Sequence, residues 1–408
     1  MNISTRVRKV FLLAFLTVLF CSFSQIQSYA DVLPTDRETP SNGNVFIAFP
    51  GYYYPDSKGK ILKEINRIRY EACKEGLRNP NDPSKRLSLS DYKPIKWSYD
   101  MEQIARIRAA ESALGGYDLG HTRPNYEICF SLESKAGLSS RSESLAWNYS
   151  GIMVGIQQWY EEKQDYIRDS ADGKIDNVAA VGHYMHLINP GFTHTAVAAF
   201  WYSNNAWVGV AQESYRSDTS LNESKINLTG YRTQRIEVNK DFLKLRPNSW
   251  FKFMNHWYCT DSSRNFVTGK INVNGKSYFF DKYGMMKTGW VKDGGNWYYI
   301  NSNGSKRTGW IKSSGNWYFL NSDGSMKTGW VKASSKWYYM DKKNGAMKTY
   351  WVKDGDNWYY LGGDGVMRTG WTKSGSNWYF LNSDGSMRTA DLTEGNTIYK
   401  FNTSGAMI

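Results

Sequence analysis

Residues 308–327 read TGWIKSSGNWYFLNSDGSMK, and this stretch is one copy of a repeat. Its opening tripeptide, or the variant Thr349-Tyr350-Trp351, returns at intervals of 20 residues, with one interval of 21. Each copy holds two short aromatic strands joined by a Gly-containing turn, which is typical of a β-hairpin. One hairpin cannot bury a core alone, whereas stacked hairpins can. We therefore predict a β-hairpin solenoid over residues 265–408, with degenerate copies at both ends.

Tryptophan is concentrated in these repeats, which hold ten of the 17 tryptophans in the chain. Some of the rings must form the core of so thin a solenoid. Rings that line a cleft between hairpins would attract a quaternary ammonium ion through cation–π interactions. Flat rings could equally stack on sugars, so both ligand classes stay open.

The repeat resembles the choline-binding (cell-wall-binding) repeat of Gram-positive surface proteins over about residues 265–408. That resemblance implies choline cages, each made of two tryptophans of one copy and a tyrosine of the next. The implied cages are Trp290, Trp297 and Tyr318; Trp310, Trp317 and Tyr338; Trp330, Trp337 and Tyr359; Trp351, Trp358 and Tyr379; and Trp371, Trp378 and Tyr399. Related repeats bind glucans instead, and the sequence separates the two poorly.

The positive charge of the chain lies almost entirely in the repeats. Residues 265–408 carry 19 basic and 10 acidic side chains, whereas residues 31–264 carry 29 and 28. An anionic partner is therefore expected for the repeats. The resemblance implies phosphocholine on wall teichoic acid, or a related wall polysaccharide, and we expect no nucleic-acid partner.

The first 30 residues have the pattern of a secretory signal peptide. Arg6, Arg8 and Lys9 precede an apolar run over 10–20, and Ser28-Tyr29-Ala30 offers a small-x-small cleavage site. The run is too short to span a bilayer, although a retained membrane anchor is the alternative. We predict a protein that is secreted to the cell wall or cell surface, without a transmembrane segment after signal removal.

Residues 58–215 are predicted to form one α+β domain. Apolar periodicity indicates helices over 58–76, from Asp100 onward and over 151–167. Strands are expected at 196–202 and 207–215, with Asn204-Asn205 as the turn between them. Residues 31–57 look like an extended lead-in, and residues 216–264 like a linker or a small β segment.

Four blocks within this domain carry a second resemblance. They are GHTRPN at 120–125, SESLAWN at 142–148, WYEE at 159–162 and GHYMHLINPGFTH at 182–194. In this order they resemble the CAP superfamily of cysteine-rich secretory, antigen 5 and pathogenesis-related proteins. The resemblance implies an α-β-α sandwich whose central cleft holds a tetrad of His121, Glu143, Glu162 and His183. Glu161 is an alternative to Glu162, because adjacent helical residues point about 100° apart.

The tetrad allows three kinds of chemistry. Two imidazoles, His121 and His183, could hold a metal ion, most plausibly Zn²⁺. The four groups could also act as acids and bases without metal. The third reading is a polar cluster that ties the structure together or binds an unknown ligand, and no sequence signature of a nucleophilic hydrolase favours catalysis.

Few cysteines remain after signal removal, namely Cys73, Cys129 and Cys259. A disulfide between Cys73 and Cys129 is possible in an oxidising compartment, which would leave Cys259 free.

The sequence as a whole indicates a secreted surface protein with two parts. We expect the repeats to hold it non-covalently on the bacterial wall, while the tetrad of the CAP-like domain binds a ligand or partner. The alternative is a wall hydrolase of the amidase or muramidase type, which would use the tetrad as a metal-dependent site.

Overall fold

The computed structural model describes residues 32–55, 57–115, 120–202, 208–217 and 229–408. Their contacts divide the chain into two compact units. The N-terminal unit runs through Asn255 and includes Thr260–Phe266, and the repeat unit holds His256–Cys259 and Val267–Ile408. The predicted signal peptide (1–30) and the predicted Asn204-Asn205 turn lie outside the described residues. Among the helices of the described residues, none has the length and apolar character needed to cross a membrane.

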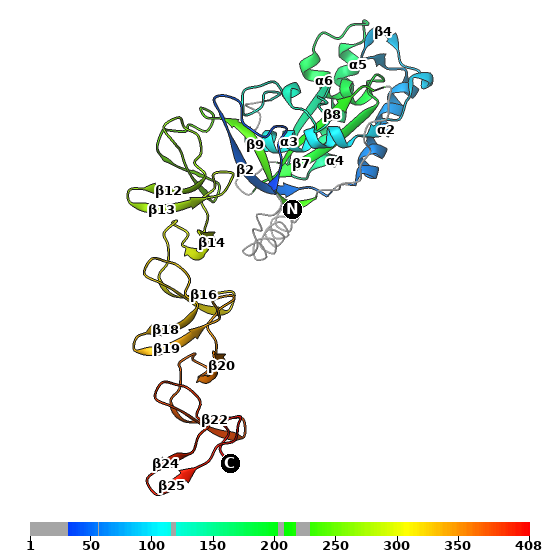
Figure 1. The fold of residues 1–408 in the computed structure, drawn as a ribbon. Coiled ribbons are helices and arrows are strands. Elements are labelled where there is room, and N and C mark those ends of the chain that lie inside the picture. The colour runs from blue at the N-terminus through cyan, green and yellow to red at the C-terminus, as the bar shows by residue number, and fades with distance from the viewer. Residues whose placement is uncertain (1–31, 56, 116–119, 203–207, 218–228) are drawn as a thin grey trace, which may run out of the picture. The chain divides into compact units, whose positions relative to one another are not determined.

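The N-terminal unit is built on a seven-stranded sheet with the order β1-β9-β2-β7-β8-β6, in which β5 also pairs with β7 (Figure 1). Its strands are β1 (Val32–Leu33), β2 (Asn44–Tyr53), β5 (Lys96–Trp97), β6 (Ser142–Asn148), β7 (His194–Trp201), β8 (Val208–Tyr215) and β9 (Gly230–Asn239). A separate small hairpin pairs β3 (Arg78–Asn79) with β4 (Asp82–Arg86).

Two of these strands correct the predicted limits of the domain. We expected 31–57 to be a lead-in and 216–264 a linker or small β segment. Instead, β2 and β9 pair antiparallel over ten residues within the sheet, from Asn44 opposite Asn239 to Tyr53 opposite Gly230. Ile47, Phe49, Ile236 and Val238 on these strands are fully buried in the core. The unit therefore starts before residue 58 and ends after residue 215.

The helices of the unit are α2 (Lys58–Glu75), α3 (Tyr99–Gly115), α4 (Ile152–Glu161), α5 (Lys163–Asp169) and α6 (Val178–Ile188), with 3₁₀ turns η2 (Leu89–Asp91) and η4 (Cys129–Ser131). The predicted apolar stripe of α2 is buried, and Ser57 caps the helix by accepting from the Lys60 N–H at 3.2 Å. The helix predicted over 151–167 is divided at Glu162 into α4 and α5. We did not predict α6.

Successive residues of β8 show that helices cover both faces of the sheet. A Cβ atom on Gly209 would lie 2.6 Å from the Ala109 carbonyl oxygen, so Gly209 faces α3. Val210 faces α4, because a Cβ on Gly155 would lie 2.9 Å from the Val210 Cγ1. Neighbouring strand residues point to opposite faces, so α3 and α4 lie on opposite sides of the sheet. The predicted α-β-α layering is present at these elements.

The possible disulfide between Cys73 and Cys129 is not formed, and both cysteines are buried. Cys73 lies on α2, which packs beside α4. Cys129 lies near Glu143, whose side chain reaches Arg108 of α3. The sheet therefore separates the two thiols.

The repeat unit consists of consecutive antiparallel hairpins, as predicted (Figure 1). The paired strands are β12 (Gly269–Val273) with β13 (Lys276–Phe280), β14 (Gly289–Asp293) with β15 (Asn296–Ile300), β16 (Gly309–Ser313) with β17 (Asn316–Leu320), β18 (Gly329–Ala333) with β19 (Lys336–Met340), β20 (Tyr350–Asp354) with β21 (Asn357–Leu361), β22 (Gly370–Ser374) with β23 (Asn377–Leu381), and β24 (Leu392–Glu394) with β25 (Thr397–Tyr399). Upstream of them lie β10 (Trp250–Phe253) and β11 (His256–Cys259).

Backbone hydrogen bonds join each copy to an earlier one. The Met326 N–H donates to the Trp297 carbonyl at 2.7 Å, and the Met347 N–H donates to the Trp317 carbonyl at 2.8 Å. The turn between copies needs glycine, since Gly385 has a φ of 84° and a Cβ there would meet the Met367 Sδ at 2.3 Å. The methionine and the glycine of the repeat motif thus serve the stacking of hairpins.

Candidate functional site

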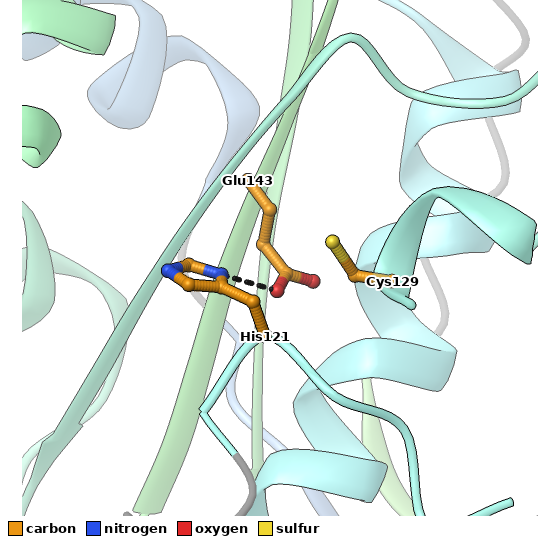
Figure 2. A group of neighbouring side chains, drawn as sticks. All are labelled: His121, Cys129 and Glu143. Carbon is orange, nitrogen blue, oxygen red and sulfur yellow. Dashed lines mark hydrogen bonds and ion pairs between the residues drawn. The ribbon is translucent and has the colours of Figure 1, made fainter. Parts of the chain in front are cut away.

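One histidine–glutamate pair lies on the α3 side of the sheet. His121, in the loop after α3, has its Nδ1 2.8 Å from the Glu143 Oε1 on β6 (Figure 2). The His121 side chain is 56% exposed, whereas Glu143 is buried. The Arg108 Nη2 also donates to the Glu143 Oε1 at 3.0 Å. Burial alone would raise the pKa of Glu143, but the Arg108 charge and the hydrogen bond from His121 hold it well below its usual value.

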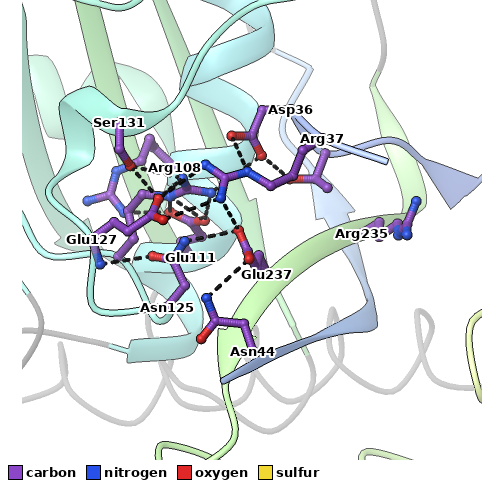
Figure 3. A network of polar contacts seen from close by, with 12 residues as sticks. Asp36, Arg37, Asn44, Arg108, Glu111, Asn125, Glu127, Ser131, Arg235 and Glu237 are labelled. Atoms are coloured by element: carbon purple, nitrogen blue, oxygen red, sulfur yellow. Dashed lines mark hydrogen bonds and ion pairs between the residues drawn. The ribbon is translucent and has the colours of Figure 1, made fainter. Parts of the chain in front are cut away.

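A buried ionic network fixes the loop that carries His121 (Figure 3). The Arg123 Nη2 lies 3.0 Å from the Glu111 Oε1 of α3 and 3.6 Å from the Asp36 Oδ1. The Asn125 Nδ2 donates to the Glu237 Oε2 of β9 at 3.1 Å. Segments from the start, middle and end of the N-terminal unit thus meet at this loop and limit where His121 can lie.

A further carboxyl group, Glu213, stands directly opposite Glu143 in the β6–β8 register. Glu213 is fully buried, and within the described residues neither of its carboxyl oxygens makes a hydrogen bond of normal geometry. Burial, together with the charge of Glu143, raises the pKa of Glu213 well above its usual value. The two neighbouring carboxyl groups therefore have pKa values shifted in opposite directions, down for Glu143 and up for Glu213.

The second histidine–glutamate pair lies between α4, α5 and α6. The His183 Nδ1 is 2.5 Å from the Glu162 Oε1, and the Tyr184 N–H donates to the Glu162 Oε2 at 3.0 Å. Glu162 occupies the junction of α4 and α5, where its side chain can reach α6. Glu161, the alternative, is 3.5 Å from Gln157 of its own helix. The structure therefore pairs His183 with Glu162.

His186, on α6 and three residues after His183, was missed by the tetrad prediction. Its Nδ1 lies 3.2 Å from the Ser144 Oγ on β6. Burial lowers the pKa of His186 to about 4, with further lowering by the charges of His183 and His121. We refer to His121, His183 and His186, together with Glu143 and Glu162, as the histidine cluster. The three-residue spacing of His183 and His186 on a helix could have signalled this.

The histidine cluster has the donors for metal or proton chemistry. In His121 and in His183 the Nδ1 faces a carboxylate, which leaves Nε2 as the nitrogen free for a ligand or proton. A carboxylate behind an imidazole is the common arrangement at metal-binding histidines, because it fixes the ring and raises its basicity. Each of the two imidazoles could therefore offer its Nε2 atom to an ion such as Zn²⁺.

In the repeat unit, the predicted cage residues come together as aromatic trios. The four complete trios are Trp290, Trp297 and Tyr318; Trp310, Trp317 and Tyr338; Trp330, Trp337 and Tyr359; and Trp351, Trp358 and Tyr379. The two indoles of a trio are 6.3–6.4 Å apart at 84–88°. The tyrosine lies 4.7–4.8 Å from the first indole at 68–71°. Four copies thus repeat one geometry.

The fifth predicted cage is present in part. Trp371 and Tyr399 are 4.7 Å apart, as in the other trios. Trp378 is 42% exposed, close to the 40–43% of Trp297, Trp317, Trp337 and Trp358. The second indole of each copy therefore offers a ring face to solvent.

Four of the five first indoles (those of Trp290, Trp330, Trp351 and Trp371) donate their N–H to a side chain of the following copy. The Trp290 Nε1 donates to the Ser313 Oγ at 3.2 Å, and the Trp351 Nε1 donates to the Ser374 Oγ at 3.0 Å. The Trp330 Nε1 donates to the Asp354 carboxylate at 3.1 Å. The Trp371 Nε1 donates to the Glu394 carboxylate, also at 3.1 Å. For Trp310 the corresponding residue is Ala333, which offers no side-chain acceptor.

At the degenerate first copy, two lysines lie where the other copies have a complete aromatic trio. Lys270 replaces the first indole, and its Nζ lies 3.0 Å from the Asp293 Oδ2. The Lys306 Nζ lies 4.2 Å from the ring centroid of Tyr298, the tyrosine of this position. A cation of the protein itself therefore covers the ring that a ligand would use elsewhere.

Comparison with protein-family models gives matches in both units. Residues 62–211 match the model of the cysteine-rich secretory protein family. Residues 267–306 and 307–350 match that of the choline-binding repeat. Residues 349–367 and 369–387 match that of a putative cell wall binding repeat. A comparison with curated proteins gave no match.

Solved structures from Streptococcus pneumoniae resemble parts of the chain. CbpJ is 29% identical over 45% of this chain and 73% of its own, with a TM-score of 0.37. Choline binding protein F is 31% identical over 48% of this chain and 65% of its own, with a TM-score of 0.34. The choline-binding domain of CbpL is 32% identical over 40% of this chain and 87% of its own, with a TM-score of 0.32.

Proposed function

Since the chain joins a domain of the cysteine-rich secretory protein family to an array of choline-binding repeats, we propose that it is secreted and held on the bacterial wall by bound choline. In this proposal the repeats hold the protein on the wall, and the histidine cluster of the N-terminal unit provides a site for a ligand or partner.

The observation that carries the proposal is the fourfold repetition of the aromatic trio. The rings of a trio lie close together at steep mutual angles, and the negative faces of such rings favour a soft methylated cation. Each ring contributes about 0.5–2 kcal/mol to binding such a cation. A single cage therefore binds choline with low affinity, but several cages that bind one polymer together gain affinity through avidity.

The repeat unit also suits the polymer that carries the cation. Phosphocholine on teichoic acid is a polyanion, and residues 265–408 carry 19 basic against 10 acidic side chains. Long-range attraction brings the chain to the wall, while the trios select the ammonium group.

Retention on a choline-type anion exchanger tests this function. We expect elution by free choline, and loss of retention in the double variant Trp310→Ala/Trp330→Ala. Trp250→Ala is the matched control, because Trp250 is an exposed tryptophan outside the trios. Binding to dextran with no effect of choline would identify glucan as the ligand instead.

For the N-terminal unit we propose ligand binding at the histidine cluster, with Zn²⁺ as the candidate ion. Support comes from the two imidazoles whose Nδ1 atoms face Glu143 and Glu162, which leaves both Nε2 atoms free. Metal content by mass spectrometry, with and without His121→Ala and His183→Ala, tests the ion. An unchanged, metal-free protein would refute it.

The second candidate function, wall hydrolysis, draws on the same two carboxylate-held imidazoles as acid and base. It predicts clearing of cell walls, followed by turbidity and by released amino or reducing groups, that disappears in His183→Ala. Wall binding without clearing would favour the binding function.

A further inference from the structure

Cys129 lies beside the first histidine–glutamate pair and takes no part in the proposed function. Its thiol is buried, and its backbone N–H donates to the His121 carbonyl at 2.9 Å, which fixes the two residues side by side. Figure 2 shows the Cys129 sulfur and the His121 ring on the two sides of the Glu143 carboxylate. One ligand atom from each of the three residues lies within 4.8 Å of the others.

These three side chains offer the sulfur, nitrogen and oxygen donors that Zn²⁺ takes in proteins. Bonds of about 2.0–2.3 Å in a tetrahedron place ligand atoms roughly 3.3–3.8 Å apart. One ligand atom of each residue already lies within 4.8 Å of the others, so a shift of about 1 Å or less brings them to this spacing. The His121 side chain is 56% exposed and has room for such a shift.

Glu213 is the second, independent observation. It is fully buried, and within the described part of the chain its carboxyl oxygens make no hydrogen bond of normal geometry. Such a group costs free energy unless a partner satisfies it. Glu213 is the cross-strand neighbour of Glu143, which places their Cβ atoms roughly 4.5–5.5 Å apart on the α3 face.

We propose that Cys129, His121 and Glu143, with Glu213 behind them, form a site for a thiophilic divalent cation such as Zn²⁺. The site requires Cys129, Glu143 and the Nδ1 side of His121, and it requires nothing of His183. It shares His121 and Glu143 with the histidine cluster, but it uses the Nδ1 side of His121 instead of the Nε2 side, and it does not depend on choline binding.

The charge of Arg108 is already offset before an ion enters, because it is paired with Glu143 and with Glu111, whose Oε2 is 2.7 Å from the Arg108 Nη1. The Cys129 sulfur would bind the ion as a thiolate, since metal ligands bind deprotonated.

Co²⁺ added to the purified full chain tests the site, because a thiolate bound to Co²⁺ gives a charge-transfer absorption in the near ultraviolet. We expect this band in the unchanged chain and in His183→Ala. Cys129→Ser should abolish the band and weaken Zn²⁺ binding at least tenfold, and Glu213→Gln should weaken it as well. Cys73→Ser is the matched control, since Cys73 is a buried thiol on the other side of the sheet.

Cobalt binding without the band would overturn the proposal, and so would a band that survives Cys129→Ser. A chain that binds no Co²⁺ would overturn it as well. A thermal unfolding curve for Cys129→Ser that matches the unchanged chain excludes misfolding as the cause of a lost band. Retention on the choline exchanger, measured on the same samples, reports separately on the proposed function.

Discussion

Gly209 is the residue where β8 passes closest to α3, and this contact fixes the thickness of one layer. A Cβ there would lie 2.5 Å from the Ser112 Oγ and 2.6 Å from both the Ala109 oxygen and the Ala113 nitrogen. Two of these neighbours are helix backbone, which cannot rotate away. We therefore expect Gly209→Ala to destabilise the N-terminal unit by about 2–3 kcal/mol.

Urea unfolding followed by circular dichroism at 222 nm measures this change, because the helices of the described residues all lie in the N-terminal unit. Gly59→Ala on α2 is the matched control. A Cβ at Gly59 meets nothing within 4 Å, so this variant should be neutral or gain up to about 1 kcal/mol. Equal midpoints for Gly209→Ala and the unchanged chain would contradict the close packing of β8 on α3.

His186 makes the stability of the same unit depend on pH. Burial and the neighbouring His183 and His121 lower its pKa from 6.5 to about 4 in the folded chain. The unfolded chain therefore binds a proton more readily between these values, so stability falls as the pH decreases from about 6.5 to about 4. One pKa unit corresponds to about 1.4 kcal/mol, which makes this loss on the order of 2–3 kcal/mol.

The variant His186→Gln should not show this loss of stability between pH 6.5 and pH 4. Urea midpoints at several pH values between 4 and 6.5, measured with a chelator present, give the comparison. Parallel pH profiles for the variant and the unchanged chain would show that His186 is not held neutral by its surroundings.

At the scale of the elements, the hairpins of the repeat unit differ in the side chain that they offer to the first indole of the copy before them. Trp330 and Trp371 donate to the carboxylates of Asp354 and Glu394, whereas Ala333 leaves Trp310 without this acceptor. A carboxylate at the indole N–H makes the ring face more negative and adds direct attraction for a cation. We expect the Trp310 cage to fill at choline concentrations about fivefold higher, a difference of about 1 kcal/mol.

Fluorine NMR of 5-fluorotryptophan-labelled protein follows the cages separately during a choline titration. Ala333→Asp should move the Trp310 cage to lower choline concentrations, and Ala333→Ser is the uncharged control. The Lys342 Nζ lies 2.7 Å from Asp354 and offsets its charge, so the Trp371 cage should be tighter than the Trp330 cage. Identical filling of all cages, before and after Ala333→Asp, would contradict the role of the acceptor.

Elements with a local signal were predictable, and elements that depend on distant partners were not. The hairpins repeat their own pattern, and α2 shows its apolar stripe, so both were predicted from the chain. In contrast, β2 pairs with β9 about 190 residues away, and β2 does not alternate because it is buried along nearly its whole length. The helix α6 is apolar around most of its surface, so it lacks the periodicity that identifies a helix.

The same reason limited the prediction of the histidine cluster. Its tetrad came from a resemblance, and the structure pairs the four residues as two histidine–glutamate couples. Glu213 and Cys129 reach Glu143 only through the β6–β8 register and the loop at 120–131, neither of which the sequence specifies. The possible disulfide between Cys73 and Cys129 is absent for a related reason, since spacing along the chain does not say which side of a sheet a cysteine occupies.

Across the whole molecule, net charge and aromatic cages are expected to act at different ranges. Residues 31–264 are nearly neutral, with 29 basic and 28 acidic side chains, so the repeats alone attract a polyanion. Attraction between exposed charges is screened within about 10 Å at 0.1 M salt, whereas a cage holds its ammonium ion in contact. Binding to whole cell walls should therefore weaken as salt is raised, while the affinity for free choline changes little.

The triple variant Lys276→Gln/Lys343→Gln/Lys400→Gln separates the two contributions, because these lysines are exposed and lie outside the trios. It should bind walls several-fold less tightly at 50 mM salt, match the unchanged chain at 500 mM, and keep its affinity for free choline. Sedimentation of walls with the protein measures the first two, and fluorescence titration the third. Wall binding that ignores both salt and these substitutions would mean that the cages hold the chain on the wall without help from its charge.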